Sequence, residues 1–462
     1  MSTSKQNTEQ LKWYEKKSRR RFSENGTDIT AEVIAAKHPK KSRSTTKEVE
    51  ATAIHKPQSS RAPYSNQIHP SATLLLQGSL FSSAVVPRDA QNIIASFDKI
   101  ISSSQPLSSK QRVLLPQQIR ELSHNLTDER SDRRLGYMNQ TTTLSAYIYY
   151  YEWWNLVRLT KLFANLPEAA LQLDDNAICL DVGSGPLTVP IALLLARPQL
   201  RNKKLTWYCM DLSSTALAAG EEILLAVSAK LQCEPWKIIR VKGELGTPIK
   251  EKVSLVTCAN VFNEIVDDFS MPPDYLAKKY CEKILSYTDH KSAQVLIVEP
   301  GVPKSARFIS LLRDAFMIRN FAPQAPCTHC NACPMDGKRG GKWCNFAFAT
   351  DDAPSALKKL SEQANLPKER AVLSFICVKE NENVQAEQDS AADKPNAMIS
   401  FRVTSDPIRL PGNRTGYYAC SEDGLLLVVT HKRLASGEWY KIKRPASLDH
   451  VDAKSGAFVI DA

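Results

Sequence analysis

The chain has 462 residues and a formal net charge of +11 at pH 7, and 43% of its residues are hydrophobic. This length and composition predict two or three folded units with real hydrophobic cores and exclude one small domain. The longest fully apolar runs, such as residues 191–196, are far shorter than the roughly 20 residues of a membrane-spanning helix, so we expect a soluble protein with no membrane partner.

The cysteine content indicates a reducing compartment. All eleven cysteines lie at or after position 179, their number is odd, and no charged-then-apolar leader stands at the start of the chain. These features predict no secretion, no disulfides and no disulfide-linked partner. The bacterial cytoplasm fits them, and the mitochondrial matrix is the alternative, because acidic residues near the start count against a transit peptide without excluding one.

Residues 1–65 carry most of the positive charge. Residues 1–62 contain fourteen Lys and Arg against seven Asp and Glu, a surplus of seven, which leaves about four positive charges for the rest of the chain. The segment is rich in Ser, Thr, Lys and Glu and has no sustained apolar period, so we expect a disordered basic tail. Such a tail steers a protein to a polyanion such as RNA, or simply keeps it soluble.

Helical periodicity begins after the tail. Apolar residues recur at spacings of three to four in residues 90–101 and 144–166, which predicts a helical lead-in domain over residues 66–170. The second of these segments contains four tyrosines and two tryptophans. Their helical spacing favours packing against a neighbouring domain over stacking on bases.

Residues 171–380 show strand and helix patterns in alternation. Five short apolar segments are typical of buried strands, with helical sequence between them. This alternation predicts a parallel sheet covered by helices on both faces, which is a Rossmann-like α/β domain. A late strand at residues 371–378 is expected to join the sheet edge. The five strands are expected at 178–185, 205–211, 236–241, 253–259 and 293–299.

The pattern changes again near the end of the chain. Residues 381–397 are polar and acidic, which is typical of a linker. Residues 398–462 contain short strand patterns separated by Pro-Gly and Asp-Gly turns. We therefore expect a small β-rich C-terminal module.

A glycine-rich turn follows the first strand of the Rossmann-like domain. Asp181, Gly183 and Gly185 form D-x-G-x-G, and Asp211 ends the second strand thirty residues after Asp181. Glycines let the backbone approach a ligand, and an acid at the end of the second strand can bind both ribose hydroxyls. An NAD site requires G-x-G-x-x-G, which is absent, so we expect S-adenosylmethionine as the cofactor.

Three other residues bear on this site. Leu187 stands where a third glycine is usual, and its side chain could crowd the methionine end of the donor. Asn263 and Glu264, after the fourth strand, either face a methyl acceptor or cap the next helix. No catalytic residue can be assigned, so the question of enzymatic activity stays open.

Four thiols crowd into residues 325–348. Cys327, Cys330 and Cys333 are spaced three apart, and Cys344 follows eleven residues on. The C-x2-C-x2-C run is typical of a cuboidal iron–sulfur cluster, whereas structural zinc usually draws its ligands from two separated C-x2-C pairs. From spacing alone, iron–sulfur, zinc and a ligand-free group of reduced thiols all stay open. The insert is rich in Gly, Lys and Arg, so a metal would have to fold it.

Together these motifs resemble a known family. LDVGSGP, NVFNEI, VEPGVP, APC-x5-CP with WCNF, and the AC-x2-DG of residues 419–424 are similar to the methyltransferase-like proteins of the small ribosomal subunit, found in mitochondria and many bacteria. The similarity runs over residues 140–445. It implies a Rossmann-like methyltransferase domain, a 4Fe-4S cluster, and a role in small-subunit assembly or translation, with the small ribosomal subunit and its rRNA as partners.

The resemblance also implies a ligand set for the cluster. The family's ligands fall on Cys327, Cys333, Cys344 and Cys420 of this chain. Cys330 stands where the family has a non-cysteine, so it is the expected spare thiol and the alternative fourth ligand. An active rRNA methyltransferase is the alternative function, and a small-molecule methyltransferase with a structural zinc is a third hypothesis.

Overall fold

The computed structural model describes residues 73–127, 136–265, 271–289, 293–337, 342–381 and 398–462. The expected tail and nearly all of the expected linker lie outside these ranges, so both stay predictions. No helix within the described ranges is long and apolar enough to cross a membrane.

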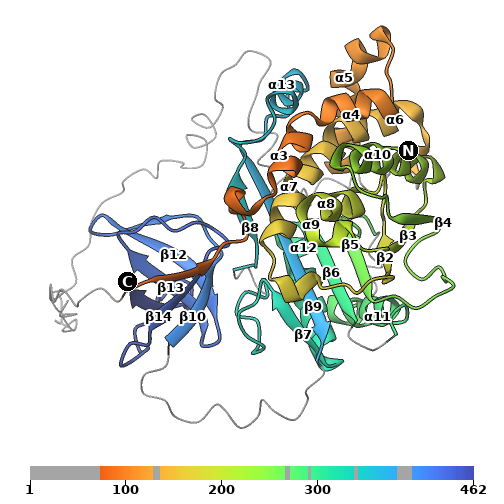
Figure 1. Cartoon of the computed structure of the whole chain (residues 1–462). Coiled ribbons are helices and arrows are strands. Elements are labelled where there is room, and N and C mark those ends of the chain that lie inside the picture. Colours follow the sequence, from red (N-terminus) through yellow and green to blue (C-terminus); the bar gives the residue numbers. More distant parts are fainter. Residues whose placement is uncertain (1–72, 128–135, 266–270, 290–292, 338–341, 382–397) are drawn as a thin grey trace, which may run out of the picture. The chain divides into compact units, whose positions relative to one another are not determined.

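The lead-in segment is mostly helical, but its first described element is a strand, β1 (Leu75–Gly78), which the helical periodicity did not predict (Figure 1). A π-helical turn at Tyr147–Glu152 joins α6 to α7, and the side chains of Trp153 and Trp154 in α7 are almost fully buried. The aromatic run therefore packs between helices. The helices are α3 (Arg88–Ala95), α4 (Phe97–Ser104), α5 (Ser109–Thr127), α6 (Thr141–Ala146) and α7 (Trp153–Asn165).

The central sheet has the strand order β4-β3-β2-β5-β6-β9-β7, with β8 paired to β9. The five strands expected from the sequence are β2 to β6, and they pair in parallel, which confirms the Rossmann-like α/β class. The strand order reverses between β3-β2 and β5-β6. The bounds are β2 (Ile178–Val182), β3 (Thr206–Asp211), β4 (Lys237–Lys242), β5 (Leu255–Ala259), β6 (Gln294–Pro300), β7 (Phe321–Ala325), β8 (Phe346–Ala349) and β9 (Arg370–Glu380).

The late strand β9 does not lie at the sheet edge, so the expectation from its sequence was wrong. It runs antiparallel between β6 and β7, and β7 is the edge strand. Six consecutive residues of β9 are buried, as expected of a strand with neighbours on both sides. No strand pattern predicted β7, because it is 5 residues long and contains Pro323, which is tolerated in an edge strand.

Helices cover both faces of this sheet, each over its own apolar core. On one face α8 (Thr188–Ala196), α10 (Ser214–Leu231) and α7 pack together, and all residues of α8 are buried. On the other face lie α11 (Pro273–Leu285) and α12 (Pro303–Ile318). Two further helices are α9 (Pro198–Arg201) and α13 (Ser355–Gln363).

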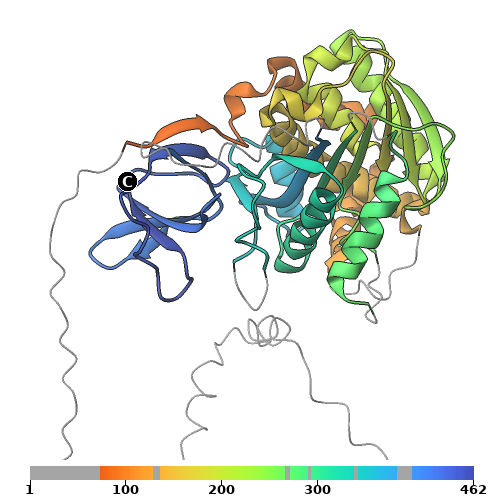
Figure 2. The same ribbon diagram turned by 90° about the horizontal axis from the view of Figure 1, so that it is seen from below.

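The C-terminal module is a second sheet with its own core (Figure 2). Its strand order is β1-β14-β10-β12-β13-β15, with β11 paired to β12. The expected Asp-Gly turn is confirmed, since Ser421 pairs with Gly424 across a tight hairpin. β1 comes from the lead-in segment and pairs antiparallel with β14. The bounds are β10 (Met398–Val403), β11 (Ile408–Leu410), β12 (Arg414–Ser421), β13 (Gly424–Thr430), β14 (Trp439–Lys443) and β15 (Phe458–Asp461).

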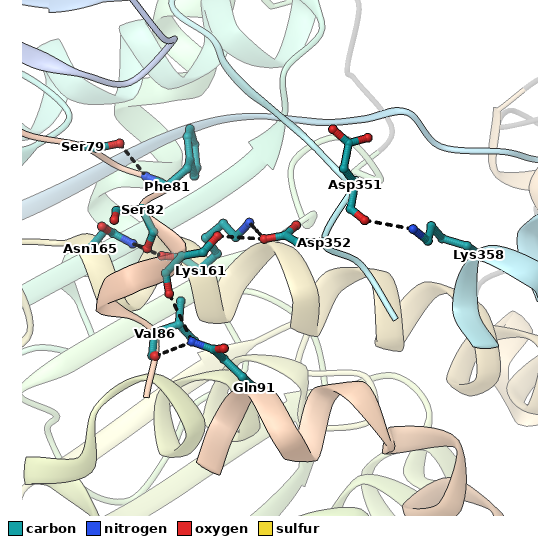
Figure 3. A network of polar contacts seen from close by, with 11 residues as sticks. Ser79, Phe81, Ser82, Val86, Gln91, Lys161, Asn165, Asp351, Asp352 and Lys358 are labelled. Carbon is teal, nitrogen blue, oxygen red and sulfur yellow. Dashed lines mark hydrogen bonds and ion pairs between the residues drawn. The ribbon is translucent and has the colours of Figure 1, made fainter. Parts of the chain in front are cut away.

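Residues 79–87, called the strap below, connect β1 to α3. Their polar contacts reach α7 and the loop after β8 (Figure 3). Asn165 Nδ2 donates to Ser82 O at 3.0 Å. Ser83 Oγ donates to Asp352 Oδ2 at 2.8 Å, and the same carboxylate pairs with Lys161 Nζ at 2.6 Å. The strap thus joins the strand of the C-terminal module to the helices over the central sheet.

Candidate functional site

A cavity of about 390 Å³ opens at the carboxyl ends of β2, β3 and β5. It lies where the strand order reverses, which is where open α/β sheets bind their ligands. Its volume falls in the range of about 300–1,000 Å³ that is typical of small-molecule sites. Of the four predicted cofactor residues, Gly183, Gly185 and Asp211 line the cavity, whereas Asp181 does not.

The two glycines of the turn have different reasons to be glycine. Both have positive φ, 67° at Gly183 and 51° at Gly185. A Cβ on Gly183 would come within 2.6 Å of Val261 Cγ2, so this glycine lets the loop after β5 pack against the turn. A Cβ on Gly185 would meet nothing nearer than Met138 Cε at 3.8 Å. Gly185 is therefore the glycine that leaves backbone open to a ligand.

Asp211 holds the turn and faces the cavity at the same time. The residue is 9% exposed, and its carboxylate accepts two backbone hydrogen bonds, Oδ2 from Gly185 N at 2.9 Å and Oδ1 from Ser213 N at 2.8 Å. Burial raises the pKa of Asp211, and the backbone donors oppose that rise. An ionised carboxylate offers about four lone-pair directions, so acceptor capacity remains for ribose hydroxyls.

Asp181 is a supporting residue under the turn. It is 1% exposed and accepts hydrogen bonds from Ser184 Oγ and Thr257 Oγ1, both at 2.6 Å. Burial raises its pKa to about 7, against the lowering effect of these two hydroxyls. The carboxyl group thus fixes the turn to β5 and is not part of the cavity lining.

Leu187 does not crowd the cavity, so that expectation from the sequence was wrong. Its side chain is fully buried in the core beneath α8 and is not part of the cavity lining. The cause is the backbone: Leu187 has φ 61° and its N donates to Ser184 O at 2.9 Å. Gly220 of α10 allows this close turn, because a Cβ there would lie 2.3 Å from the carbonyl carbon of Pro186.

The lead-in helices supply a wall of the cavity that sequence reasoning missed. Met138 and Tyr147 line it together with the glycine turn. Burial raises the pKa of Tyr147, and the nearby carboxylate of Glu264 raises it further. Tyr147 opens the aromatic run, but nothing in its local sequence separates it from the packing tyrosines that follow.

The loop after β5 supplies another part of the cavity wall. Asn260 and Glu264 line the cavity, and Asn260 Oδ1 accepts from Arg158 at 3.1 Å. Asn263 is not part of the cavity lining, because its side-chain amide, oriented with the nitrogen toward its acceptors, donates to Glu299 Oε2 at 3.1 Å and to Asn260 O at 2.6 Å. Of the two predicted acceptor-facing residues, Glu264 is therefore the one placed at the cavity.

The cysteine-rich insert contacts the C-terminal module beside Cys420. Cys327 follows β7, and its Sγ accepts from Arg313 Nε at 3.3 Å. Cys420 lies on β12, and its Sγ is 3.3 Å from His329 Nε2. Two stretches of chain about ninety residues apart in sequence are thus in direct contact. Cys330 is exposed.

Electrostatics connect the same four thiols that the resemblance singled out. Burial raises the pKa of Cys344, and Cys333, Cys327 and Cys420 raise it further. Burial likewise raises the pKa of Cys420, followed by the effects of Cys327 and Cys333. The four thiols therefore lie within electrostatic reach of one another.

A metal centre on these thiols is not confirmed. Across the described ranges, no group of three or more His, Cys, Asp or Glu side chains is arranged to hold a metal ion. The iron–sulfur cluster and the zinc alternative therefore both stay predictions.

The reversed strand order, the glycine turn and the acid that ends β3 define a protein with a methyltransferase-like Rossmann domain. A family model described as mitochondrial small ribosomal subunit Rsm22 matches residues 156–449, which is more than half of the chain. The chain belongs to this family.

Several solved structures are distantly similar to this chain. A protein designated a class I S-adenosylmethionine-dependent methyltransferase from Listeria monocytogenes is 11% identical over 65% of this chain and 90% of its own, with a TM-score of 0.30. YcgJ from Bacillus subtilis is 11% identical over 50% and 99%, with a TM-score of 0.28. A protein designated an RNA methyltransferase from Pyrococcus horikoshii is 13% identical over 49% and 82%, with a TM-score of 0.27. No curated protein matches the chain.

Proposed function

We propose that this protein acts on the small ribosomal subunit, in its assembly or in translation, and contacts its rRNA. The observation that supports this function is the family match over residues 156–449, which takes in the glycine turn, Asp211 and all four clustered thiols. The family description favours mitochondria over the bacterial cytoplasm. The basic tail is the proposed segment for steering to RNA.

The test is cosedimentation. Tagged protein from mitochondrial extracts should move with small-subunit particles through a sucrose gradient. It should stay with them when low magnesium separates the two ribosomal subunits, and it should shift toward the top after nuclease digestion of the rRNA. Protein that runs free in an extract with intact small subunits would contradict the proposal.

S-adenosylmethionine is the proposed ligand of the cavity. Asp211 would accept from the ribose hydroxyls, and the open backbone at Gly185 would lie against the ligand. When bound, this cofactor supplies an activated methyl group. The protein's part is to bind and orient it at the carboxyl ends of β2 and β3.

Methyl transfer to rRNA is the second candidate function. It is favoured by the placement of Tyr147 and Glu264 at the cavity. Burial keeps the Tyr147 hydroxyl protonated, so it can donate a hydrogen bond, and the carboxylate of Glu264 can accept one. Transfer of a labelled methyl group to small-subunit RNA, compared with a Glu264→Gln variant, tests this candidate.

A 4Fe-4S cluster on Cys327, Cys333, Cys344 and Cys420 is the proposed metal centre, with Cys330 as the spare thiol. The donor set fits such a cluster, since four thiolates are its ordinary ligands. The charge of the surroundings fits as well. Arg313 of α12 is 2% exposed and donates to Cys327, so a buried cation that favours anionic sulfur lies against the insert.

Replacing Leu187 with glycine should leave the affinity for S-adenosylmethionine unchanged, because the side chain lies outside the cavity lining. The variant should be less stable. Loss of a buried leucine costs about 2–5 kcal/mol, and relief of the left-handed backbone returns about 1–2 kcal/mol. Calorimetric titration and urea unfolding measure the two quantities. Tighter binding by the glycine variant would show that Leu187 obstructs the site.

A further inference from the structure

Arg402 of β10 is a buried cation that lies beside the clustered thiols. The residue is 8% exposed, and its guanidinium lies 5.9 Å from the centre of the Trp439 ring. Burial lowers the pKa of Arg402 to about 10, and the thiols of Cys327, Cys344 and Cys420 oppose this lowering. The side chain therefore stays charged at neutral pH. Among the described residues, no carboxylate pairs with it.

A buried charge without a counter-charge costs free energy, and neutral thiols supply no counter-charge. Four thiolates bound to an iron–sulfur core supply a negative counter-charge, because their charges outweigh the positive charge of the core. The positive charge of Arg402 is thus compensated when the thiolates hold a cluster, and it is not compensated when the thiols are protonated.

Arg402 also connects three parts of the chain. Its Nε donates to Pro326 O at 2.6 Å, directly before Cys327, and its Nη1 donates to Gly437 O at 2.8 Å. The same carbonyl of Gly437 accepts from Leu80 N of the strap at 3.2 Å. Gly437 has φ 90°, and a Cβ there would lie 3.1 Å from both Leu80 Cβ and the Phe81 ring. The insert, the C-terminal module and the strap therefore meet at one guanidinium and one glycine.

Arg313, the other buried arginine near the thiols, differs from Arg402 in its charge partner and in the parts of the chain that it joins. It pairs with Asp314 at 3.1 Å and donates to the carbonyls of His329 and Asn331 at 3.2 and 2.7 Å. Its charge has a carboxylate partner whether or not the thiols are ligated. Its hydrogen bonds stay within α12 and the insert, and although its charge also acts on Cys420, no hydrogen bond joins Arg313 to the C-terminal module among the described residues.

We propose that Arg402 couples the iron–sulfur cluster to the docking of the C-terminal module and the strap. When the cluster is present, its negative charge stabilises the guanidinium, which holds Pro326 and Gly437 together. When the cluster is lost, the uncompensated cation drives the contact at Gly437 apart and frees Leu80. This inference rests on the proposed cluster.

Hydrogen exchange of the strap tests the coupling. Removing the cluster from the wild-type protein with a chelator should speed exchange of the Leu80 amide at least about tenfold, because a buried charge loses its partner. In Arg402→Met no cation remains. Cluster-free Arg402→Met should therefore exchange more slowly at Leu80 than cluster-free wild type. This comparison holds even for a variant that takes up no iron.

Arg370→Met is the matched control. Arg370 also joins the central sheet to the module, through both oxygens of Asp406 at 2.6 and 2.7 Å, but both partners are well exposed. Its loss should change exchange equally with and without the cluster. If Arg402→Met and wild type show the same difference between cluster-loaded and cluster-free protein, the coupling is absent.

The reduction potential of the cluster is a second measurement, and it would not change if Arg402 had only a structural role. Removing a cation beside the cluster should shift the potential to more negative values in Arg402→Met, and Arg402→Lys and Arg370→Met should stay near wild type. An unchanged potential in Arg402→Met would overturn the electrostatic part of the inference. Wild-type protein that never contains iron would instead overturn the proposed cluster. Iron analysis therefore distinguishes the absence of a cluster from the absence of coupling through Arg402.

Discussion

Replacing Cys420 with serine should abolish the iron–sulfur cluster, whereas replacing Cys330 with serine should leave it in place. Cys420 lies within electrostatic reach of Cys327, Cys333 and Cys344, and Cys330 is exposed. A cuboidal cluster needs four thiolates, so the wild type and Cys330→Ser should each contain about four irons per chain. Cys420→Ser should contain almost none. Iron and sulfide analysis of anaerobically purified protein measures this.

The reverse result would mean that the cluster uses the local C-x2-C-x2-C run and does not join the insert to the C-terminal module. One zinc and no iron in protein never exposed to air would reject both ligand sets. Cys233→Ser, at a partly buried thiol outside the insert, controls for the general effect of losing a cysteine. It should keep its full iron content.

Asp211→Ala should weaken binding of S-adenosylmethionine by about 1–3 kcal/mol, which is roughly 5–150-fold in Kd. The ribose hydroxyls would lose their acceptor. The amides of Gly185 and Ser213 would lose theirs as well, so the turn would loosen where the ligand lies. Isothermal titration of folded protein measures the affinity, and circular dichroism verifies the fold.

Asp181→Asn is the matched control for that experiment. Asp181 is also a buried acid of the same motif, but its oxygens bind Ser184 and Thr257 and do not face the cavity. Because burial raises its pKa to about 7, an uncharged amide is a close substitute. Its affinity should stay near wild type. If the two variants lose affinity equally, Asp211 acts through the turn alone and not on the ribose.

The Rossmann-like class could be predicted because its parallel strands appear in the sequence as distinct apolar segments with helical sequence between them. β2, β3, β5 and β6 are mostly apolar and almost entirely buried, as expected of parallel strands between helices. The position of β9 could not be predicted, because its place between β6 and β7 depends on pairing with a short strand that contains Pro323. Strand order depends on contacts between residues far apart in the sequence, so the local pattern of apolar residues does not predict it.

The same limit applies to the sites. Gly185 and Asp211 were predictable because a glycine turn and an acid at the end of the next strand have a fixed spacing in α/β sheets. Tyr147 was not, since it reaches the cavity from a helix that precedes the sheet. Cys420 was suggested only by resemblance, because the local run of thiols favours Cys330 and no spacing rule links residues ninety positions apart.

The pairing of β1 with β14 has a consequence for the order in which the protein forms. Leu75 of β1 pairs with Lys441, so this contact closes a loop that contains almost the entire folded body. Contacts of such high sequence separation form late, because the entropy of a long loop must be lost before the contact stabilises anything. During synthesis β1 emerges early and has no strand to pair with until β14 follows. Until then the unpaired backbone of β1 is available to chaperones or to another growing chain.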